Sequence, residues 1–474
     1  MNKVINCDLA IIGAGAGGLS LAAGTAQLGL KVVLVEQGAM GGDCLNYGCI
    51  PSKSLLAAAE AHWNTNHNEV LGITGSQEPV DFTRVMEHVR EVIETIAVHD
   101  SIERFEGLGV QVIQASGTFI DAKTLKAGSQ EIKAKRYVIA TGSSATIPPI
   151  PGLDKCHFYT NETIFNLTQL PPHLLIIGGG PIGCELAQAF AMLGSKVTVL
   201  EHFNILTHDD SEAVEVIRQS LIQFGITLYE QVDIAEIESN EEGQTIIRCK
   251  KNNDEMVISG THLLVAAGRK PNIEQLNCAL ANIQVNSKGI VVDNRLRTSN
   301  KKIFAIGDVT GSLLFTHIAN YHAGVVLQNI AFKLPVKVTD NAVPWVTYTS
   351  PELAHAGKSE SICSSLGIKY ELLKVDYSSN DRAQTNKQTK GFIKVLVTPK
   401  GIILGVTIVG HQAGELLLPW VIAIREGKTL RTFTDTIIAY PTLSELSKRV
   451  ASQFYTPKLF SKNVKKLVKF LSYF

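Results

Sequence analysis

Two stretches of the chain share one pattern of apolar, glycine and polar positions. Residues 8–36 and 174–201 each predict a buried strand, a Gly-x-Gly-x-x-Gly turn, a helix with small residues on one face and a second strand that ends in glutamate. The first copy has Gly13, Gly15, Gly18 and Glu36, and the second has Gly178, Gly180, Gly183 and Glu201. Each residue of the second copy lies 165 positions after its counterpart in the first. The duplication predicts two dinucleotide-binding units.

Each turn has the chemistry of a phosphate site. Free backbone N–H groups and the positive end of the helix dipole stabilise a pyrophosphate. The first glycine permits the tight turn, the second lets the backbone approach the phosphate, and the third lets helix and strand pack closely. Glu36 and Glu201 are then expected to accept from ribose hydroxyls. His202, Phe203 and Asn204 follow Glu201 and offer no arginine for a 2′-phosphate, so we expect NAD(H) to be favoured over NADP(H).

Further strand patterns indicate how the domains are arranged. The segments 136–152, 262–272 and 301–311 are each an apolar strand that ends in a glycine turn. They favour an α/β fold with two Rossmann-like domains, the second inserted in the first. Beyond about residue 340, the alternation at 392–398 and 402–410 predicts antiparallel strands, and helices are predicted at 412–427 and 443–455. This part is expected to be an α+β domain.

Composition narrows the function further. Lysine plus arginine and aspartate plus glutamate both number 44, so charge gives no reason to expect a nucleic-acid partner. The most apolar segment, 174–193, is broken by glycines and a proline, and the start of the chain does not resemble a signal peptide. We therefore expect a cytoplasmic protein. Its eight cysteines are too few for a disulfide scaffold, so any disulfide is expected to be catalytic.

The segment GGDCLNYGCIPSKSLL (41–56) carries the strongest chemical signal. Cys44 and Cys49 have four residues between them, and no second cysteine pair or histidine pair nearby completes a zinc site, so no resident metal is expected. A thiolate at a helix entrance is stabilised by the dipole and by a cation, here Lys53 one turn beyond Cys49. Two such thiols can store two electrons as a reversible disulfide.

This segment resembles the redox signature of the FAD-dependent pyridine nucleotide–disulfide oxidoreductases, which include dihydrolipoamide dehydrogenase, glutathione reductase and mercuric reductase. The similarity extends over nearly the whole chain and includes the ATG turn, AAGRKPN, FAIGDV and YPTLSE. It implies an FAD-binding domain at 1–150 and 275–338, an NAD(P)-binding domain at 151–274 and a C-terminal dimerisation domain at 339–474. A homodimer is implied as well.

The resemblance also implies roles for single residues. Cys49 would lie next to the flavin, and Cys44 would face the substrate. Lys53 would pair with Glu185 beside the flavin ring. Asp308 would bind the ribityl chain of the FAD, and the remaining cofactor-binding residues would be Thr141, Gly142, Gly268 and His317. A purely structural role explains His317 equally well.

The C-terminal motif departs from the family pattern. Dihydrolipoamide dehydrogenase and glutathione reductase carry His-Pro-Thr-x-x-Glu, whereas this chain has Tyr440 in place of the histidine, with Glu445 retained. Mercuric reductase has tyrosine in this region but also needs a C-terminal cysteine pair, and no cysteine follows Cys363. The favoured hypothesis is electron transfer between NAD(P)H and a small-molecule or protein-borne disulfide. The alternatives are a mercuric or other metal-ion reductase, and a non-enzymatic flavoprotein with a partner- or membrane-binding role.

The tail, residues 456–474, has an unusual composition. It has no acidic residue, and its apolar positions fall on one helical stripe. Its lysines are Lys458, Lys462, Lys465, Lys466 and Lys469. Packing of this helix on the protein's own dimer is the favoured explanation. Weak contact with an anionic membrane is the alternative.

Overall fold

The computed structural model describes residues 3–73, 75, 79–252 and 254–474. The chain forms two compact units. The first consists of residues 1–65, 76–202 and 231–339, and the second of residues 66–75, 203–230 and 340–474.

The first unit contains a mainly parallel sheet built from distant parts of the chain. Its order is β3-β2-β1-β6-β5-β4, and β18 pairs in parallel with β6. The strands are β1 (Lys3–Ile12), β2 (Val32–Glu36), β3 (Gln111–Gln114), β4 (Gly117–Phe119), β5 (Leu125–Ala127), β6 (Gln130–Ile139) and β18 (Ile303–Ala305). Because β18 returns to the sheet that β1 begins, the predicted interruption of the first domain is confirmed.

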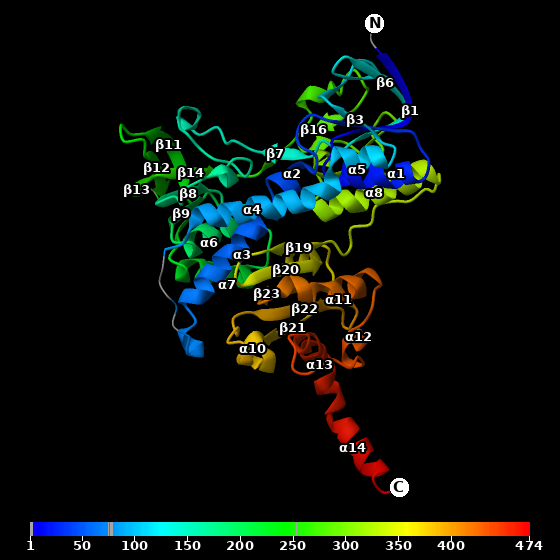
Figure 1. Cartoon of the computed structure of the whole chain (residues 1–474). Coiled ribbons are helices and arrows are strands. Elements are labelled where there is room, and N and C mark those ends of the chain that lie inside the picture. The colour runs from blue at the N-terminus through cyan, green and yellow to red at the C-terminus, as the bar shows by residue number, and fades with distance from the viewer. Residues whose placement is uncertain (1–2, 74, 76–78, 253) are drawn as a thin grey trace. The chain divides into compact units, whose positions relative to one another are not determined.

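Helices cover one face of this sheet. The helix α1 (Ala16–Gln27) lies beside α8 (Thr316–Ala331), and both pack on buried residues of the strands (Figure 1). Their approach is close, because a Cβ at Gly17 would lie 3.1 Å from the Ala319 carbonyl oxygen. The small residues expected on one face of the first helix therefore serve packing between α1 and α8.

A second parallel arrangement lies in the same unit. The strands β8 (His173–Ile177), β9 (Lys196–Glu201) and β14 (His262–Val265) are parallel, with β8 between the other two, and α6 (Pro181–Met192) follows β8. An antiparallel layer contains β11 (Asp233–Ser239), β12 (Thr245–Lys251) and β13 (Asp254–Gly260). The other elements of the unit are α2 (Gly42–Asn46), α3 (Cys49–Asn66), α4 (Phe82–Ala97), α5 (Ile102–Gly107), β7 (Ser143–Ala145), β15 (Arg269–Pro271), β16 (Val285–Asn286) and β17 (Gly289–Ile290).

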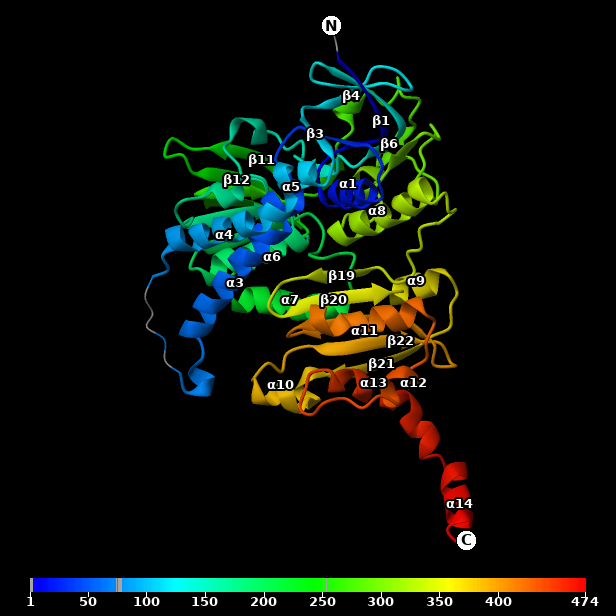
Figure 2. The ribbon, with the colours of Figure 1, turned by 45° about the vertical axis from the view of Figure 1, so that its right-hand side comes forward.

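The second unit is built on a five-stranded antiparallel sheet of order β19-β20-β23-β22-β21. The helix α11 (Ala413–Arg425) packs against it (Figure 2), and Trp420 stacks on Phe433 with 3.9 Å between ring centroids. The predicted antiparallel pair near 392–410 and the helices near 412–427 and 443–455 are confirmed. The strands of this sheet are β19 (Pro344–Thr347), β20 (Glu352–Gly357), β21 (Glu371–Asp376), β22 (Phe392–Val397) and β23 (Ile403–Gly410). The unit also contains β10 (Thr227–Glu230), which lies outside this sheet, and the helices α7 (Ser211–Gln223), α9 (Glu360–Ser365), α10 (Asp381–Thr385), α12 (Arg431–Thr434), α13 (Glu445–Leu459) and α14 (Lys462–Leu471).

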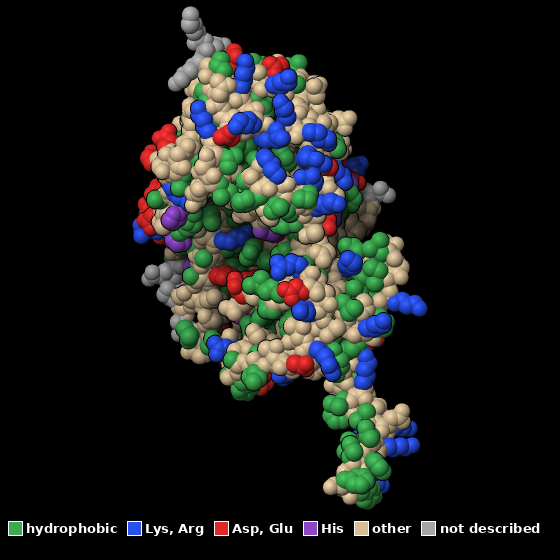
Figure 3. Space-filling view, turned by 90° about the vertical axis from the view of Figure 1, so that its right-hand side faces the viewer, with side chains coloured by type: hydrophobic (Ala, Val, Ile, Leu, Met, Phe, Trp, Pro, Cys, Tyr) green, Lys and Arg blue, Asp and Glu red, His purple; other side chains and the backbone are tan. Residues whose placement is uncertain are grey.

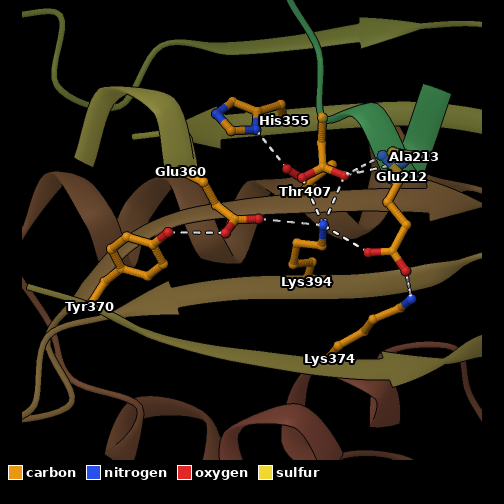
Figure 4. Close-up of polar contacts among 9 residues, drawn as sticks. Glu212, Ala213, His355, Glu360, Tyr370, Lys374, Lys394 and Thr407 are labelled. Atoms are coloured by element: carbon orange, nitrogen blue, oxygen red, sulfur yellow. Dashed lines mark hydrogen bonds and ion pairs between the residues drawn. The ribbon is translucent and has the colours of Figure 1, made fainter. Parts of the chain in front are cut away.

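A buried cation ties α7 to this sheet. Lys394 on β22 is 6% exposed, and its Nζ lies 2.8 Å from Asp210 Oδ2. The same nitrogen lies 2.9 Å from Glu212 Oε2 (Figure 4). Asp210 also caps α7, because its side chain accepts from two backbone N–H groups of the first turn. Burial alone would lower the Lys394 pKa, but the hydrogen bonds to Asp210 and Glu212 outweigh it and raise the pKa. This cluster explains why 203–230 belongs to the same compact unit as the C-terminal sheet.

The predicted amphipathic tail is present as two helical pieces. Residues 456–459 complete α13, and α14 follows after a short break, extending away from the sheet of its unit (Figure 1). None of the ten residues of α14, all of which the structure describes, is buried. Every helix in the described part of the chain is too short or too polar to span a lipid bilayer.

Candidate active site

The two cysteines of the redox segment lie on consecutive helices. Cys44 lies within α2, and Cys49 is the first residue of α3. Both carry free thiols, and a hydrogen bond between the two side chains is the largest influence on the pKa of each. Gly41 and Gly42 have left-handed φ angles of 91° and 64°. A Cβ at Gly42 would lie 2.6 Å from Gly15 Cα, so the glycine pair lets the redox segment lie against the first dinucleotide turn.

The surroundings of the two thiols separate their acidities. The hydrogen bond from Cys44, together with Thr316 and the charge of Lys53, lowers the Cys49 pKa to about 6, although burial and Glu185 oppose this. The same hydrogen bond, burial and the charge of Cys49 raise the Cys44 pKa. Cys49 is therefore the thiol that ionises first, while Cys44 keeps its proton and donates it to the Cys49 sulfur.

A partly buried ion pair lies behind Cys49. Lys53 Nζ is 2.6 Å from Glu185 Oε2, which joins α3 to α6. The Glu185 side chain is only 5% exposed, so this carboxylate depends on its cation. The helix that follows the second glycine turn is thereby connected to the helix that carries the redox thiol. The role of this pair beside a flavin stays a prediction.

Both glycine turns have the shape that a dinucleotide phosphate needs. A Cβ at Gly13 or Gly178 would lie 2.3 Å or 2.4 Å from a backbone oxygen of the neighbouring strand end. A Cβ at the third glycine, Gly18 or Gly183, would meet the carbonyl oxygen of the first glycine in the same turn. The middle glycine differs: the nearest atom to a Cβ at Gly15 is 4.0 Å away, and nothing lies within 4 Å of one at Gly180. Space is thus left at the position where a pyrophosphate would approach, and the residues fit two dinucleotides.

The glutamates of the two copies make equivalent hydrogen bonds. Glu36 Oε2 accepts from the Ala14 N–H at 2.6 Å, and Glu201 Oε2 accepts from the Gly179 N–H at 2.5 Å. Each carboxylate is thereby fixed beside its glycine turn. A carboxylate has about four acceptor sites, so capacity remains for ribose hydroxyls. Ribose binding by Glu36 and Glu201 stays a prediction.

A polar network that was not predicted links Asp308 to the redox segment. Ser143 Oγ donates to Asp308 Oδ2 at 2.6 Å, and Arg269 Nε donates to Ser143 Oγ at 2.8 Å. The Arg269 guanidinium also lies 3.1 Å from Asp43, which precedes Cys44 and accepts from Asn161. Burial raises the Asp308 pKa, against the hydrogen bond from Ser143 and the charge of Arg269. Arg269 and Asp43 stand in the two motifs quoted above, but the sequence does not show that they form an ion pair.

The other predicted cofactor residues lie in the same unit. Thr141 Oγ1 donates to the Asn272 carbonyl at 2.7 Å, which fixes the turn that contains Gly142. Gly142 and Gly268 both have left-handed φ angles. His317 is exposed, and its ring stacks on Phe315 with 5.1 Å between centroids. The neighbouring Thr316, which was not singled out from the sequence, is the residue whose hydroxyl lies 3.7 Å from Cys49 Sγ.

The residues of the C-terminal motif belong to the second unit. Tyr440 is 70% exposed, and its hydroxyl donates to Asp381 Oδ2 at 3.0 Å. This hydrogen bond and the charge of Asp381 raise the Tyr440 pKa. Glu445 is the first residue of α13. The expected position of Tyr440 beside Cys44 of a partner subunit stays a prediction.

Two dinucleotide turns and a hydrogen-bonded thiol pair in one unit define an oxidoreductase that couples nucleotide cofactors to dithiol chemistry. The family model for pyridine nucleotide-disulphide oxidoreductase matches residues 7–325, and the model for the dimerisation domain of the same family matches residues 343–451. The chain belongs to this FAD-dependent family, as its resemblance implied. It is accordingly a pyridine nucleotide–disulfide oxidoreductase, and its Cys44 and Cys49 lie in the redox segment of the matched region.

Individual relatives cover nearly the whole chain. It is 34% identical over 456 residues to a mercuric reductase from Staphylococcus aureus, covering 96% of this chain and 83% of the relative. It is 33% identical to a dihydrolipoyl dehydrogenase from Geobacillus stearothermophilus, covering 94% and 96%. Among solved structures it is similar to the HOCl-induced flavoprotein disulfide reductase RclA from Escherichia coli, with a TM-score of 0.84, 29% identity and coverage of 94% and 99%.

Proposed function

We propose that the protein is a homodimeric, NADH-dependent disulfide oxidoreductase of the dihydrolipoyl dehydrogenase type, acting on a small-molecule or protein-borne disulfide. The observation that carries the proposal is the thiol pair, in which Cys44 hydrogen-bonds Cys49 and only Cys49 has a lowered pKa. The similarity to dihydrolipoyl dehydrogenase and the match to the dimerisation domain support it. Bound FAD supplies the two-electron transfer between the nicotinamide and the cysteine pair.

The two cysteines then divide the work on the substrate. The Cys44 sulfur attacks the substrate disulfide, its proton passes to the Cys49 thiolate, and one substrate thiolate leaves. Cys49 next attacks the Cys44 sulfur of the mixed disulfide and releases the second substrate sulfur, which takes the proton. Two electrons move from the dithiol to the substrate, and a Cys44–Cys49 disulfide is formed.

The preference for NADH rests on Glu201. This carboxylate lies at the carboxyl end of β9, fixed by the Gly179 N–H, where the adenosine ribose of the nucleotide is expected. A negative charge there accepts from both ribose hydroxyls and repels a 2′-phosphate. The next residue, His202, lies 2.8 Å from the carboxylate of Asp233, which is a further acidic group near this position.

A metal-ion reductase is the second candidate. The similarity to mercuric reductase favours it, and the solved structures of RclA include a Cu(II) complex. Within the described residues, no group of three or more His, Cys, Asp or Glu side chains is arranged to hold a metal ion. A soft ion would therefore have to be taken as substrate by Cys44 and Cys49. Residues 364–474 contain no cysteine that could pass such an ion to this pair, so we rank this candidate second.

Replacement of Tyr440 distinguishes the two candidates. Tyrosine with a raised pKa is a poor base, and loss of a positioned base typically lowers a rate by ~10²–10⁴-fold. Wild type should therefore oxidise dihydrolipoamide slowly while reducing artificial acceptors well, and Tyr440→His should raise the dihydrolipoamide kcat. Tyr440→Phe, which also lacks a base, is the matched control and should stay slow.

The same assay can reject the disulfide proposal. Turnover of lipoamide, glutathione disulfide, Hg(II) and Cu(II) is compared in wild type and both variants, with the diaphorase rate as internal control. Metal-ion turnover well above every disulfide, unchanged by Tyr440→His, would favour the metal-ion reductase. Fast wild-type oxidation of dihydrolipoamide would show that a residue other than Tyr440 serves as the base.

A further inference from the structure

The last helix has two chemically opposite sides. At 100° per residue, the side chains of α14 separate into an apolar and a basic stripe (Figure 3). The apolar stripe contains Val464, Leu467, Val468 and Leu471, and the basic stripe contains Lys462, Lys465, Lys466 and Lys469. Ser461 caps the helix by accepting from the Val464 N–H. The segment is thus a short amphipathic helix with a defined start.

The apolar stripe is open to solvent. Leu467, Val468 and Leu471 are 54%, 59% and 56% exposed, far from the burial that such side chains usually reach. The aromatic residues Phe470 and Phe474 lie edge to face, with centroids 5.5 Å apart, and are also exposed. The surface of its own unit therefore does not cover this helix.

Charge argues against a second copy as the cover. No acidic residue follows Glu445, so two α14 helices in contact would bring their lysines together without carboxylates. The match to the dimerisation domain ends at residue 451, before the helix begins. A ten-residue helix also presents much less than the ~800 Å² per partner that a stable protein interface buries.

We propose that α14 docks the enzyme on an anionic lipid surface. The apolar stripe would lie at the boundary between headgroups and acyl chains, and the lysines would contact lipid phosphates and other anionic headgroup oxygens. Since the helix is far shorter than a bilayer core, it lies on the membrane and does not cross it. The proposal concerns location only and does not depend on the substrate.

Vesicle sedimentation of the full-length holoenzyme tests this docking. The protein should sediment with vesicles of phosphatidylcholine and phosphatidylglycerol but not with phosphatidylcholine alone. Binding should fall as salt rises from about 0.05 M to about 0.5 M, because the lysines are solvent-exposed. Each lysine near an anionic surface contributes roughly fivefold, so the triple variant Lys465→Gln, Lys466→Gln and Lys469→Gln should bind roughly 100-fold more weakly.

Matched variants make the outcome decisive. A control that removes three exposed lysines elsewhere in the unit, Lys369→Gln, Lys387→Gln and Lys400→Gln, should bind like wild type. A double variant of the apolar stripe, Leu467→Ser and Leu471→Ser, should lose binding and keep its diaphorase rate. The proposal would be overturned if the wild-type protein failed to bind anionic vesicles at low salt. It would also be overturned if the control variant lost as much vesicle binding as the triple variant of α14. An apolar variant that leaves vesicle binding unchanged but dissociates the dimer in light scattering would show that a second copy covers the helix.

Discussion

Replacing Thr316 with valine tests how the site stabilises the Cys49 thiolate. Thr316 begins α8, and its hydroxyl lies 3.7 Å from Cys49 Sγ. A hydrogen bond to a charged group contributes ~1.5–3 kcal/mol, and this contact is long, at 3.7 Å, so the lower end applies. Since one pKa unit corresponds to about 1.36 kcal/mol, Thr316→Val should raise the Cys49 pKa by about one unit, from about 6 to about 7. At pH 7 the thiolate fraction would fall from roughly nine-tenths to roughly half.

The pH dependence of thiol alkylation measures this shift. The rate of iodoacetamide reaction is followed in the NADH-reduced enzyme, and the thiolate–flavin absorbance of the same samples gives an independent midpoint. Valine is isosteric with threonine, so α8 keeps its first residue without a change in bulk. Thr316→Ser retains the hydroxyl and should titrate like wild type. A Thr316→Val midpoint within a few tenths of a unit of wild type would refute the assigned hydrogen bond.

Three further predictions follow from the site and the buried cluster. Cys49→Ser should abolish the long-wavelength thiolate–flavin absorbance of the reduced enzyme, whereas Cys44→Ser should retain it. If both variants give the wild-type spectrum, Cys44 and Cys49 are wrongly assigned as the redox pair. The kcat/KM for NADH should exceed that for NADPH by about tenfold or more, because the hydrogen bonds from the ribose hydroxyls to Glu201 are charge-assisted. Glu201→Gln should lower this NADH-to-NADPH ratio. A wild-type enzyme that prefers NADPH would contradict the role given to Glu201. Lys394→Met leaves the largely buried Asp210 carboxylate without its cation and should lower the free energy of unfolding in urea by about 3–5 kcal/mol. Lys374→Met removes a more exposed ion pair with Glu212 and a contact with the Phe392 ring, and should cost less than about 1–2 kcal/mol.

Features set by local spacing could be predicted from the sequence. The 165-residue offset between the two glycine turns predicts equivalent geometry, and the structure shows it in the paired φ angles of 105° at Gly13 and 113° at Gly178. The hydrogen bonds from Ala14 to Glu36 and from Gly179 to Glu201 show the same offset. Short motifs of this kind constrain their own backbone, so sequence alone is informative there.

Contacts between distant segments could not be predicted in the same way. Arg269 and Asp43 are separated by the whole second glycine unit, and the ion pair exists only because β15 pairs with β7 beside the redox segment. The hydrogen bond of Thr316 to Cys49 depends likewise on where α8 begins relative to α3. Lys394 gives no signal either, because an isolated lysine in an apolar strand does not indicate that Asp210 and Glu212 will surround it.

The position of Tyr440 changes the expected route of the substrate proton. In a pair where Cys44 donates to Cys49, the acceptor for the Cys44 proton is already in place. The Tyr440 hydroxyl donates to Asp381, which raises its pKa and leaves it protonated at neutral pH. Reduction of a disulfide is therefore expected to depend less on a histidine, because Cys49 can receive the proton as Cys44 attacks. Oxidation of a dithiol does need an external base, because the disulfide form of the pair has no thiolate to accept a proton. We therefore predict that the replacement of histidine by tyrosine favours electron flow from NADH towards a disulfide.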